Sequence, residues 1–315
     1  MKSIRAFPPL QSLFFCLLLL QSCQHKPELQ MLEEEVNEEL HIEEQNTEKI
    51  HEVMNEISIE SYFSWITSLC AFYSQDSTQA LGYELKPKVL IHHNPWIIDA
   101  FRNSDYYLQE EAGNFQYDQR KQIIIEKGSS LRIPTKKEAE EIEAFLASIR
   151  IDINLPEFKL RILSANVELF DFLVRVGQNR TKFLKSEGRD FDLRTKIGKG
   201  EIADIILTPE YTNFNTGEVY EFTRRDDGKT TRMPLIPTLE PEINGICHGQ
   251  LIHPTTNPNT LGKAYSHGCI GTREGDAWII YFYSRIGTPI EIRYQLEIEN
   301  EAGELTRLED IYGLK

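Results

Sequence analysis

The sequence predicts a mainly β domain in the C-terminal half, preceded by an α/β accessory region and a helical stalk. Between residues 150 and 194, apolar residues alternate with polar ones, as in half-buried strands, and turn residues separate the runs. Residues 28–60 instead repeat apolar residues at helical spacing on a Glu-rich background. With 315 residues, the chain can form two folded units at most, each with its own core.

The charge and composition of the chain argue against some classes of function. The net charge is −15, with 26% charged and 40% hydrophobic residues. These fractions are ordinary for a soluble globular protein, and the acidity argues against a basic surface that binds nucleic acid. We therefore expect no nucleic-acid partner.

The N-terminus has the features of an export signal. Lys2 and Arg5 precede an apolar run at residues 13–20, which is too short to span a bilayer as a mature helix. The following Leu20-Gln-Ser-Cys23 resembles a bacterial lipobox, which implies removal of residues 1–22 and a lipid on Cys23. A plain secretory signal is the alternative. With the lipobox, Cys23 anchors the chain to the periplasmic face of a bacterial membrane, the outer membrane being preferred over the inner.

The rest of the chain divides by its patterning. Ile50, Val53 and Ile57 continue the helical spacing of the stalk, which would lift the domain off its anchor. In the accessory region, His92-His93 precedes a turn and fits surface or capping histidines better than a metal site. The predicted segments are a signal peptide at 1–22, the stalk at 23–60, the accessory region at 61–147, the β domain at 148–295 and a tail at 296–315.

Several elements can be placed within these segments. The accessory region should hold helices over 62–73 and 96–102, two short strands within 123–134, and a helix capped by Thr135. The β domain should begin with strands at 151–155 and 158–162. Its last helix, 273–285, lies between Thr272 and Gly287, and a final strand follows at 288–294.

Five cysteines are present, and three remain after the signal and Cys23 are set aside. Cys70, Cys247 and Cys269 are an odd number outside the cytoplasm, so at least one thiol stays free unless it pairs between chains. A Cys70–Cys247 disulfide is possible, and the sequence does not decide it.

The stretch 252–272 holds two histidines and a cysteine between glycines and prolines. A thiol becomes a nucleophile when a base takes its proton, and His253 lies sixteen residues before Cys269 on a loop that can fold back. Gly268 allows a tight backbone whose N–H groups suit an oxyanion hole. A helix that starts near Arg273 would favour the thiolate through its positive end. These features point to a catalytic loop.

Other interpretations stay open for the same residues. His248, His253, His267 and Cys269 could bind zinc, but their spacing matches no compact zinc module, and we expect no metal. They could also be structural, as a buried thiol with satisfied histidines. In a papain-like hydrolase the cysteine precedes the histidine along the chain, which is the reverse of the order here.

The segment Ile252-His-Pro-Thr-Thr-Asn-Pro-Asn-Thr-Leu-Gly-Lys-Ala-Tyr-Ser-His-Gly-Cys-Ile270 resembles the active-site signature of YkuD-type L,D-transpeptidases. That signature runs I-H-G-T, a short loop, then S-x-G-C-I-R. Val174-Arg-Val-Gly-Gln178 is similar to the family's V-x-V-G-[KQ] strand, and Gly287-Thr-Pro-Ile-Glu-Ile292 to its closing strand. The resemblance covers residues 148–295 and implies a β-sandwich catalytic domain. More faintly, residues 128–134 resemble part of a LysM-like glycan-binding piece.

The resemblance implies acyl transfer on peptidoglycan stem peptides without a cofactor. Cys269 would attack the carbonyl of the third stem residue, His253 would act as base, and an amine would then take the acyl group in a 3→3 cross-link. Backbone N–H groups of Gly268 and Cys269, helped by His267, would hold the oxyanion. The residues expected to contact substrate are Ser266, Arg273, His248 and Tyr265.

Two positions depart from the family pattern. Pro254 replaces the glycine after the histidine, although its carbonyl can still orient the imidazole. Gly271 replaces the usual arginine, and Arg273 is a candidate to supply the missing charge. Water as acceptor would make the site a carboxypeptidase. A cysteine amidase and a non-catalytic wall-binding lipoprotein remain further alternatives.

Overall fold

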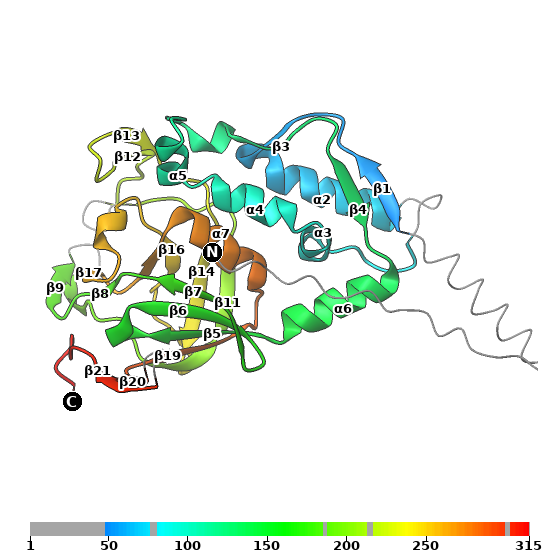
Figure 1. The fold of residues 1–315 in the computed structure, drawn as a ribbon. Coiled ribbons are helices and arrows are strands. Elements are labelled where there is room, and N and C mark those ends of the chain that lie inside the picture. Colours follow the sequence, from blue (N-terminus) through cyan, green and yellow to red (C-terminus); the bar gives the residue numbers. More distant parts are fainter. Residues whose placement is uncertain (1–47, 76–80, 185–187, 213–216, 300–302, 315) are drawn as a thin grey trace, which may run out of the picture. The chain divides into compact units, whose positions relative to one another are not determined.

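A computed structural model of the chain describes residues 48–75, 81–184, 188–212, 217–299 and 303–314 (Figure 1). From Glu48 onward these residues form one compact unit. The predicted signal peptide, Cys23 as the predicted lipidation site, and most of the predicted stalk lie outside the described residues. Among the described helices, none has both the length and the apolar character needed to cross a membrane.

The accessory region combines helices with two short strand pairs. β1 pairs with β4 and β2 pairs with β3, both antiparallel. The predicted helices and strands of this region are confirmed, and two further helices are present, one ending at His93 and one at Glu111. The elements are β1 (Lys49–Glu52), β2 (Ile57–Ser58), α2 (Ile59–Gln75), α3 (Pro87–His93), α4 (Trp96–Asn103), α5 (Tyr106–Glu111), β3 (Ile123–Ile125), β4 (Ser130–Ile133) and α6 (Lys136–Ala147). Its likeness to a LysM piece stays a prediction.

The end of the predicted stalk is not helical. Residues 49–52 form a strand against β4, and the helix begins only at Ile59. Val53 and Ile57 are buried, whereas Ile50 is exposed, so the apolar residues do not share one helix face. Ile and Val are stiff at χ1 and favour extended backbone once a partner strand is available, which explains why helical spacing misled here.

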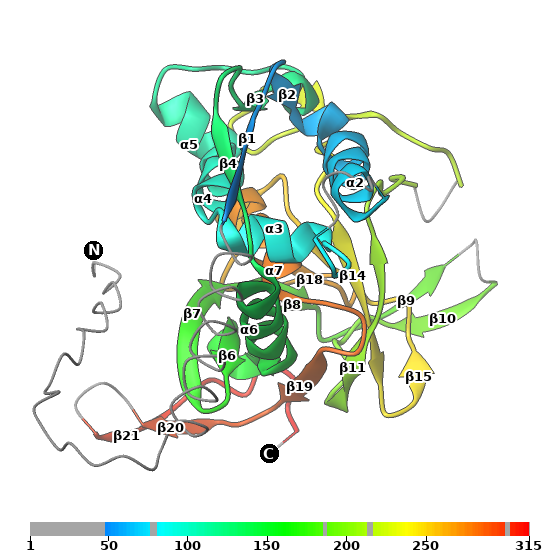
Figure 2. The same ribbon diagram turned by 90° about the vertical axis from the view of Figure 1, so that its right-hand side faces the viewer.

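Helix α6 joins the accessory region to the β domain (Figure 2). The Thr135 hydroxyl accepts a hydrogen bond from the Glu138 N–H, and the Glu138 carboxylate accepts one from the Thr135 N–H, which completes a capping box. The predicted cap is therefore confirmed. The helix delivers the chain directly to the first strand of the main sheet.

Nine of the strands in the described residues form one mixed sheet. Its order is β18-β16-β14-β11-β19-β5-β6-β7, with β15 added beside β14. The β18–β16 and β19–β5 pairs are parallel and the others are antiparallel. The bounds are β5 (Ile149–Asn154), β6 (Lys159–Ser164), β7 (Val167–Leu173), β11 (Gly198–Ile206), β14 (Thr238–Ile243), β15 (Ile246–Cys247), β16 (Ile252–Pro254), β18 (Ile270–Thr272) and β19 (Pro289–Arg293).

Smaller pairs complete the β domain. A short parallel pair, β8 with β17, runs beside the catalytic loop, and β9–β10 and β12–β13 are antiparallel. Their bounds are β8 (Val176–Gly177), β9 (Thr181–Leu184), β10 (Arg189–Asp192), β12 (Phe222–Arg224), β13 (Thr230–Arg232) and β17 (Ala264–Ser266). The mainly β character expected for this half of the chain is confirmed.

Helix α7 (Glu274–Tyr283) lies between the sheet and the accessory helices (Figure 1). Trp278 and Phe282 on this helix are fully buried, and both rings contact Phe101 of α4. Buried residues of the accessory region and the β domain form one continuous cluster. The predicted boundary at 147/148 therefore separates two stretches of sequence that share one core.

The C-terminal segment is more than a tail. Residues Glu297–Glu299 (β20) and Leu305–Arg307 (β21) pair as a hairpin, and Tyr312 is buried. The Tyr312 ring stacks on Tyr294, and its hydroxyl donates to the Gly177 carbonyl at 2.8 Å. The segment expected to be a tail thus holds a strand pair and a buried aromatic residue that packs on the β domain.

Candidate active site

Two neighbouring parallel strands bring His253 and Cys269 together. β16 and β18 pair so that His253 lies opposite Gly271. Cys269 comes two residues before Gly271, and alternate residues of a strand face the same side. Cys269 and His253 therefore share one face of the sheet. The Leu251 N–H, two residues before His253, lies 3.4 Å from the Cys269 sulfur.

His253 is held in one tautomer by the residue that follows it. Its Nδ1 lies 2.8 Å from the Pro254 carbonyl oxygen, and because a carbonyl only accepts, Nδ1 carries the proton. Nε2 is then free to accept a proton, as a general base requires. Burial lowers the pKa of His253 to about 4, with a further contribution from the Arg175 charge.

Cys269 is a free, half-buried thiol. Burial raises its pKa, while the Leu251 N–H and the Arg175 charge act in the opposite direction. At neutral pH the resting pair is consequently a thiol beside a neutral imidazole. Such a pair makes its nucleophile when the proton moves to the base during attack.

The turn before the sulfur is closed by Ser266. Its hydroxyl donates to the Cys269 carbonyl at 2.5 Å and accepts from the Gly268 N–H at 3.2 Å. Gly268 has a φ of +115°, and a Cβ there would lie 2.4 Å from the Gln250 amide nitrogen, so only glycine fits. Ser266 thus shapes the loop, and being 6% exposed it has little surface to offer a substrate.

These contacts correct the predicted oxyanion hole. The Gly268 N–H is already bonded to Ser266 and is not free for an oxyanion. In the described part of the chain, the Cys269 N–H donates to no group, so this half of the prediction fits the geometry. The predicted stabilisation of the thiolate by a helix N-terminus does not fit the structure either. Helix α7 begins at Glu274, after the extended strand β18, and its Gly275 N–H donates to the Asp105 carboxylate at 2.9 Å.

The other predicted residues lie at different places around the thiol. His267 and Tyr265 are exposed. The pKa of His267 is lowered by burial and then by Lys182 and Arg180, which places two cations beside it. His248 follows β15 and is not on β16, so the strand pairing favours His253 as the base.

Arg273 does not take the place of the absent arginine. It is exposed and lines a groove of about 420 Å³ together with acidic residues that include Glu110, Asp226 and Asp227. Arg175 is instead the cation whose charge acts on Cys269. In the sequence analysis, Arg175 is only the variable position of the Val-x-Val-Gly strand motif, and no role is predicted for it.

Three further residues support the loop without having been predicted. The Thr195 hydroxyl donates to the Gly268 carbonyl at 2.9 Å, and its own N–H donates to the Tyr312 hydroxyl at 3.2 Å. The Gln250 side chain bonds the backbone of Arg194 and Lys196. In sequence, Thr195, Gln250 and Tyr312 belong to no recognisable motif.

The remaining thiols do not join the site. Cys70 is buried in α2, and burial raises its pKa to about 12. Cys247 is exposed on β15. Both are free, so the Cys70–Cys247 disulfide that the sequence left open is not formed in this structure.

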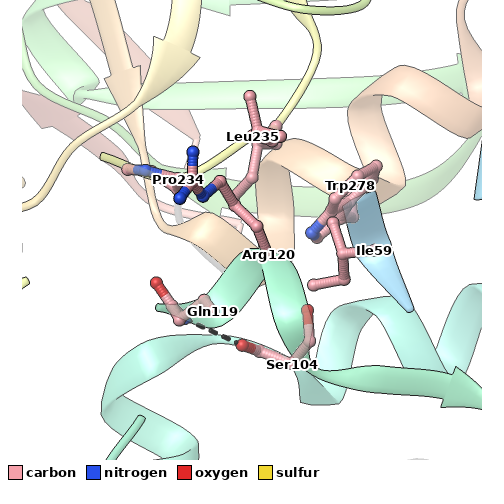
Figure 3. Close-up of a pocket in the computed structure, with 8 residues that line it drawn as sticks. Ile59, Ser104, Gln119, Arg120, Pro234, Leu235 and Trp278 are labelled. Atoms are coloured by element: carbon pink, nitrogen blue, oxygen red, sulfur yellow. Dashed lines mark hydrogen bonds between the residues drawn. The ribbon is translucent and has the colours of Figure 1, made fainter. Parts of the chain in front are cut away.

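A small cavity near α7 is also separate from the thiol (Figure 3). Its volume of about 10 Å³ has room for roughly one water molecule. Gln119 donates to the Ser104 carbonyl at its wall, at 3.0 Å. The catalytic loop contributes no residue to its lining, which comprises Ile59, Ser104, Gln119, Arg120, Pro234, Leu235, Ile236 and Trp278.

Within the described ranges, one group of side chains has the spacing of metal ligands. The ligand atoms of Glu48, His93 and Glu138 lie within 4.8 Å of one another. Glu48 is paired with Arg132 at 2.6 Å, and Glu138 caps α6, so both carboxylates already have structural partners. The group lies in the accessory region and contributes nothing to Cys269.

The site thus combines a thiol, an imidazole oriented by a backbone carbonyl, and a turn that requires glycine. Residues 148–292 match the YkuD family, described as the L,D-transpeptidase catalytic domain. This match confirms the resemblance that the sequence showed over these residues. No protein with a curated description matches the chain.

Solved structures with similar folds include three L,D-transpeptidases. The protein from Mycobacterium smegmatis is 14% identical, with a TM-score of 0.32, and the match covers 53% of this chain and 63% of that one. The Xylanimonas cellulosilytica protein is 13% identical, with a TM-score of 0.35 and coverages of 66% and 94%. The Enterococcus (E.) faecium catalytic domain is 13% identical, with a TM-score of 0.29 and coverages of 47% and 98%.

Proposed function

We propose that the protein is a peptidoglycan L,D-transpeptidase that works through a thioester on Cys269. The observation that carries the proposal is the pairing of β16 with β18, which sets a tautomer-fixed His253 beside the thiol strand inside a YkuD-type domain. The proposed donor is a tetrapeptide stem, and the proposed leaving group is its terminal D-Ala.

The proposed reaction has two halves. In the first, the Cys269 sulfur bonds to the carbonyl carbon of the third stem residue as His253 Nε2 takes the thiol proton. The tetrahedral oxyanion is met by the Cys269 N–H. The C–N bond to D-Ala then breaks, and His253 returns the proton to the departing amine.

In the second half, the side-chain amine of a neighbouring stem attacks the thioester. His253 takes a proton from this amine, and the sulfur leaves as the thiol is restored. The product is a 3→3 cross-link. If water attacks instead, the same thioester yields a tripeptide, so a carboxypeptidase activity needs no further residue.

We also propose that Cys23 carries a lipid and holds the domain at the periplasmic face of a membrane. The basis is the sequence Leu20-Gln-Ser-Cys23 after an apolar run. Metabolic labelling with a lipid precursor should mark the wild-type chain, whereas Cys23→Ala should remain unlabelled.

Incubation with a disaccharide tetrapeptide tests the reaction. We expect release of D-Ala and a dimer whose mass equals two donors minus one D-Ala, and Cys269→Ala should abolish both. A carbapenem should add its mass to Cys269 in the intact protein. Cys247→Ala is the matched control, because this exposed thiol lies outside the site and its loss should leave the adduct in place.

The outcomes separate the alternatives. Tripeptide without dimer would mean that water is the acceptor. Cleavage at another bond would indicate an amidase. An unreactive Cys269 in a folded protein would leave a wall-binding role and contradict the proposal.

A further inference from the structure

Arg175 is fixed beside the catalytic strand by its backbone. It lies between β7 and β8, and its N–H donates to the Gly271 carbonyl at 2.9 Å. The Gly271 N–H in turn donates to the Arg175 carbonyl at 3.0 Å. This two-bond bridge sets the residue two positions after Cys269 directly opposite Arg175.

The Arg175 side chain fills the space above Gly271. A Cβ at position 271 would lie 2.5 Å from the Arg175 Nε, 2.7 Å from its Cγ and 3.0 Å from its Cδ. Two of these distances are shorter than any normal contact between atoms that are not bonded, and the third is at the limit. A residue larger than glycine at position 271 must therefore displace the Arg175 side chain. The observed position of the Arg175 side chain therefore requires glycine at position 271.

The charge of Arg175 has no carboxylate partner among the described residues. Its Nε is buried without a hydrogen-bond partner, and its Nη1 makes one long contact, 3.4 Å, to the Thr260 hydroxyl. Burial lowers its pKa, as expected for a cation that is partly removed from water. Such a cation gains most from an anion placed next to it.

The titratable groups that face Arg175 belong to the catalytic site. Cys269 and Tyr265 on the catalytic loop interact with its charge, and so do His253 and His267. Of these, Cys269 becomes anionic during the proposed reaction. Lys182 and Arg180 act on His267 and do not act on Cys269.

We propose that Arg175 supplies the positive charge that stabilises the Cys269 thiolate, and that Gly271 is required because the Arg175 side chain occupies its Cβ position. The proposal rests on the proposed function only in taking Cys269 as the nucleophile. Arg175 acts through the sulfur and makes the thiolate easier to form.

The rate of alkylation of Cys269 by iodoacetamide, measured against pH, tests the proposal. The reaction follows the thiolate fraction, and a Cys247→Ser background removes the exposed competing thiol. In this background, Arg175→Met should raise the pH midpoint by about 1 unit, which is a roughly tenfold slower reaction below the midpoint. Arg175→Lys retains the charge and should shift the midpoint less.

Substitutions at position 271 form the second part of this experiment. Gly271→Ala should displace the arginine and raise the midpoint in the same direction as Arg175→Met. The reciprocal variant Arg175→Gly with Gly271→Arg should restore a midpoint close to that of the parent, because the charge returns from the neighbouring strand. A merely structural role for Arg175 would not produce this rescue.

Lys182→Gln is the matched control, since this cation faces His267 and should leave the midpoint of Cys269 unchanged. Thermal unfolding identifies any variant that fails to fold. If Arg175→Met does not fold, the midpoint of Arg175→Lys can still be compared with that of the parent. An unchanged midpoint in folded Arg175→Met overturns the electrostatic role. A parent-like midpoint in Gly271→Ala overturns the steric coupling. Because alkylation needs no peptidoglycan, both results can be read even if the protein proves not to be a transpeptidase.

Discussion

Burial acts in opposite directions on the two residues at the centre of the site. It lowers the pKa of His253 to about 4 and raises the pKa of Cys269, because it disfavours the charged form of each. Both residues are therefore neutral over a wide interval around pH 7. The neutral imidazole is the form that can accept a proton, and Nδ1 is already committed to Pro254.

This arrangement sets the acid limit of the reaction. As the pH falls through about 4, His253 becomes protonated and no longer serves as a base, so activity should fall there and stay nearly constant from pH 5 to 8. The measurement is kcat/KM for the disaccharide tetrapeptide across this range. An acid limb near 6.5, the ordinary value for histidine, would contradict the assignment of a buried neutral base.

At the scale of elements, the catalytic loop is held from outside its own sequence. β8 runs parallel to β17, and Gln178 bonds the carbonyls of Tyr265 and Ser266 through its side chain and N–H. On the other side, the Tyr312 hydroxyl joins the Thr195 N–H to the Gly177 carbonyl, and Thr195 holds the Gly268 carbonyl. The C-terminal segment thus supports the turn that carries the thiol.

Tyr312→Phe tests this support by removing one hydroxyl. The Thr195 N–H and Gly177 carbonyl would each lose a buried partner, so the free energy of unfolding should fall by about 1–3 kcal/mol. Urea unfolding measures this loss, and carbapenem acylation of Cys269 should also slow. Tyr117→Phe is the control, because Tyr117 is exposed and its hydroxyl forms no hydrogen bond with the described residues. Equal stability of the two variants would show that the hydroxyl does not support the loop.

Local patterning predicted the elements that depend on local sequence. The alternation at residues 151–162, the cap at Thr135 and the motif around Cys269 all have short-range signals, and each element was found. β11 was missed because Gly198 and Gly200 interrupt its alternation. Gly200 is needed there, since a Cβ would lie 1.7 Å from the Glu242 carbonyl of β14. Arg175 and Tyr312 were missed because contacts between distant residues bring them to the site. Arg175 is placed by its bridge to Gly271, and Tyr312 by stacking on Tyr294 and by the hydrogen bonds of its hydroxyl.

At the scale of the whole molecule, a buried ion pair fastens the accessory region to the β domain. Arg225 donates to Glu274 at 2.8 Å, and both side chains are almost completely buried. Gln119 of the accessory region bonds both of them, and the Tyr106 N–H donates to Glu274. Every charged atom of the pair meets a partner, as a buried ion pair requires.

Removal of one partner should therefore be costly. Arg225→Met leaves the Glu274 carboxylate buried without its cation, and the free energy of unfolding should fall by roughly 3–5 kcal/mol. Lys159→Met is the control, because its pair with Asp171 lies at the surface and should contribute at most about 1 kcal/mol. Urea unfolding of both variants provides the comparison. Similar losses in the two would mean that the buried Arg225–Glu274 pair contributes no more to stability than a surface pair.

The hydroxyl bridge from Tyr312 also has a consequence for the order of events during synthesis. Tyr312 is synthesised after Cys269 and His253, and the Gly268 turn lacks the support of the Tyr312 hydroxyl until this residue has left the ribosome. The contacts span long stretches of sequence, so they form late in folding. A nascent chain that is stalled before residue 312 should already contain Cys269 and His253, and yet lack the hydroxyl contact that completes the turn before the sulfur.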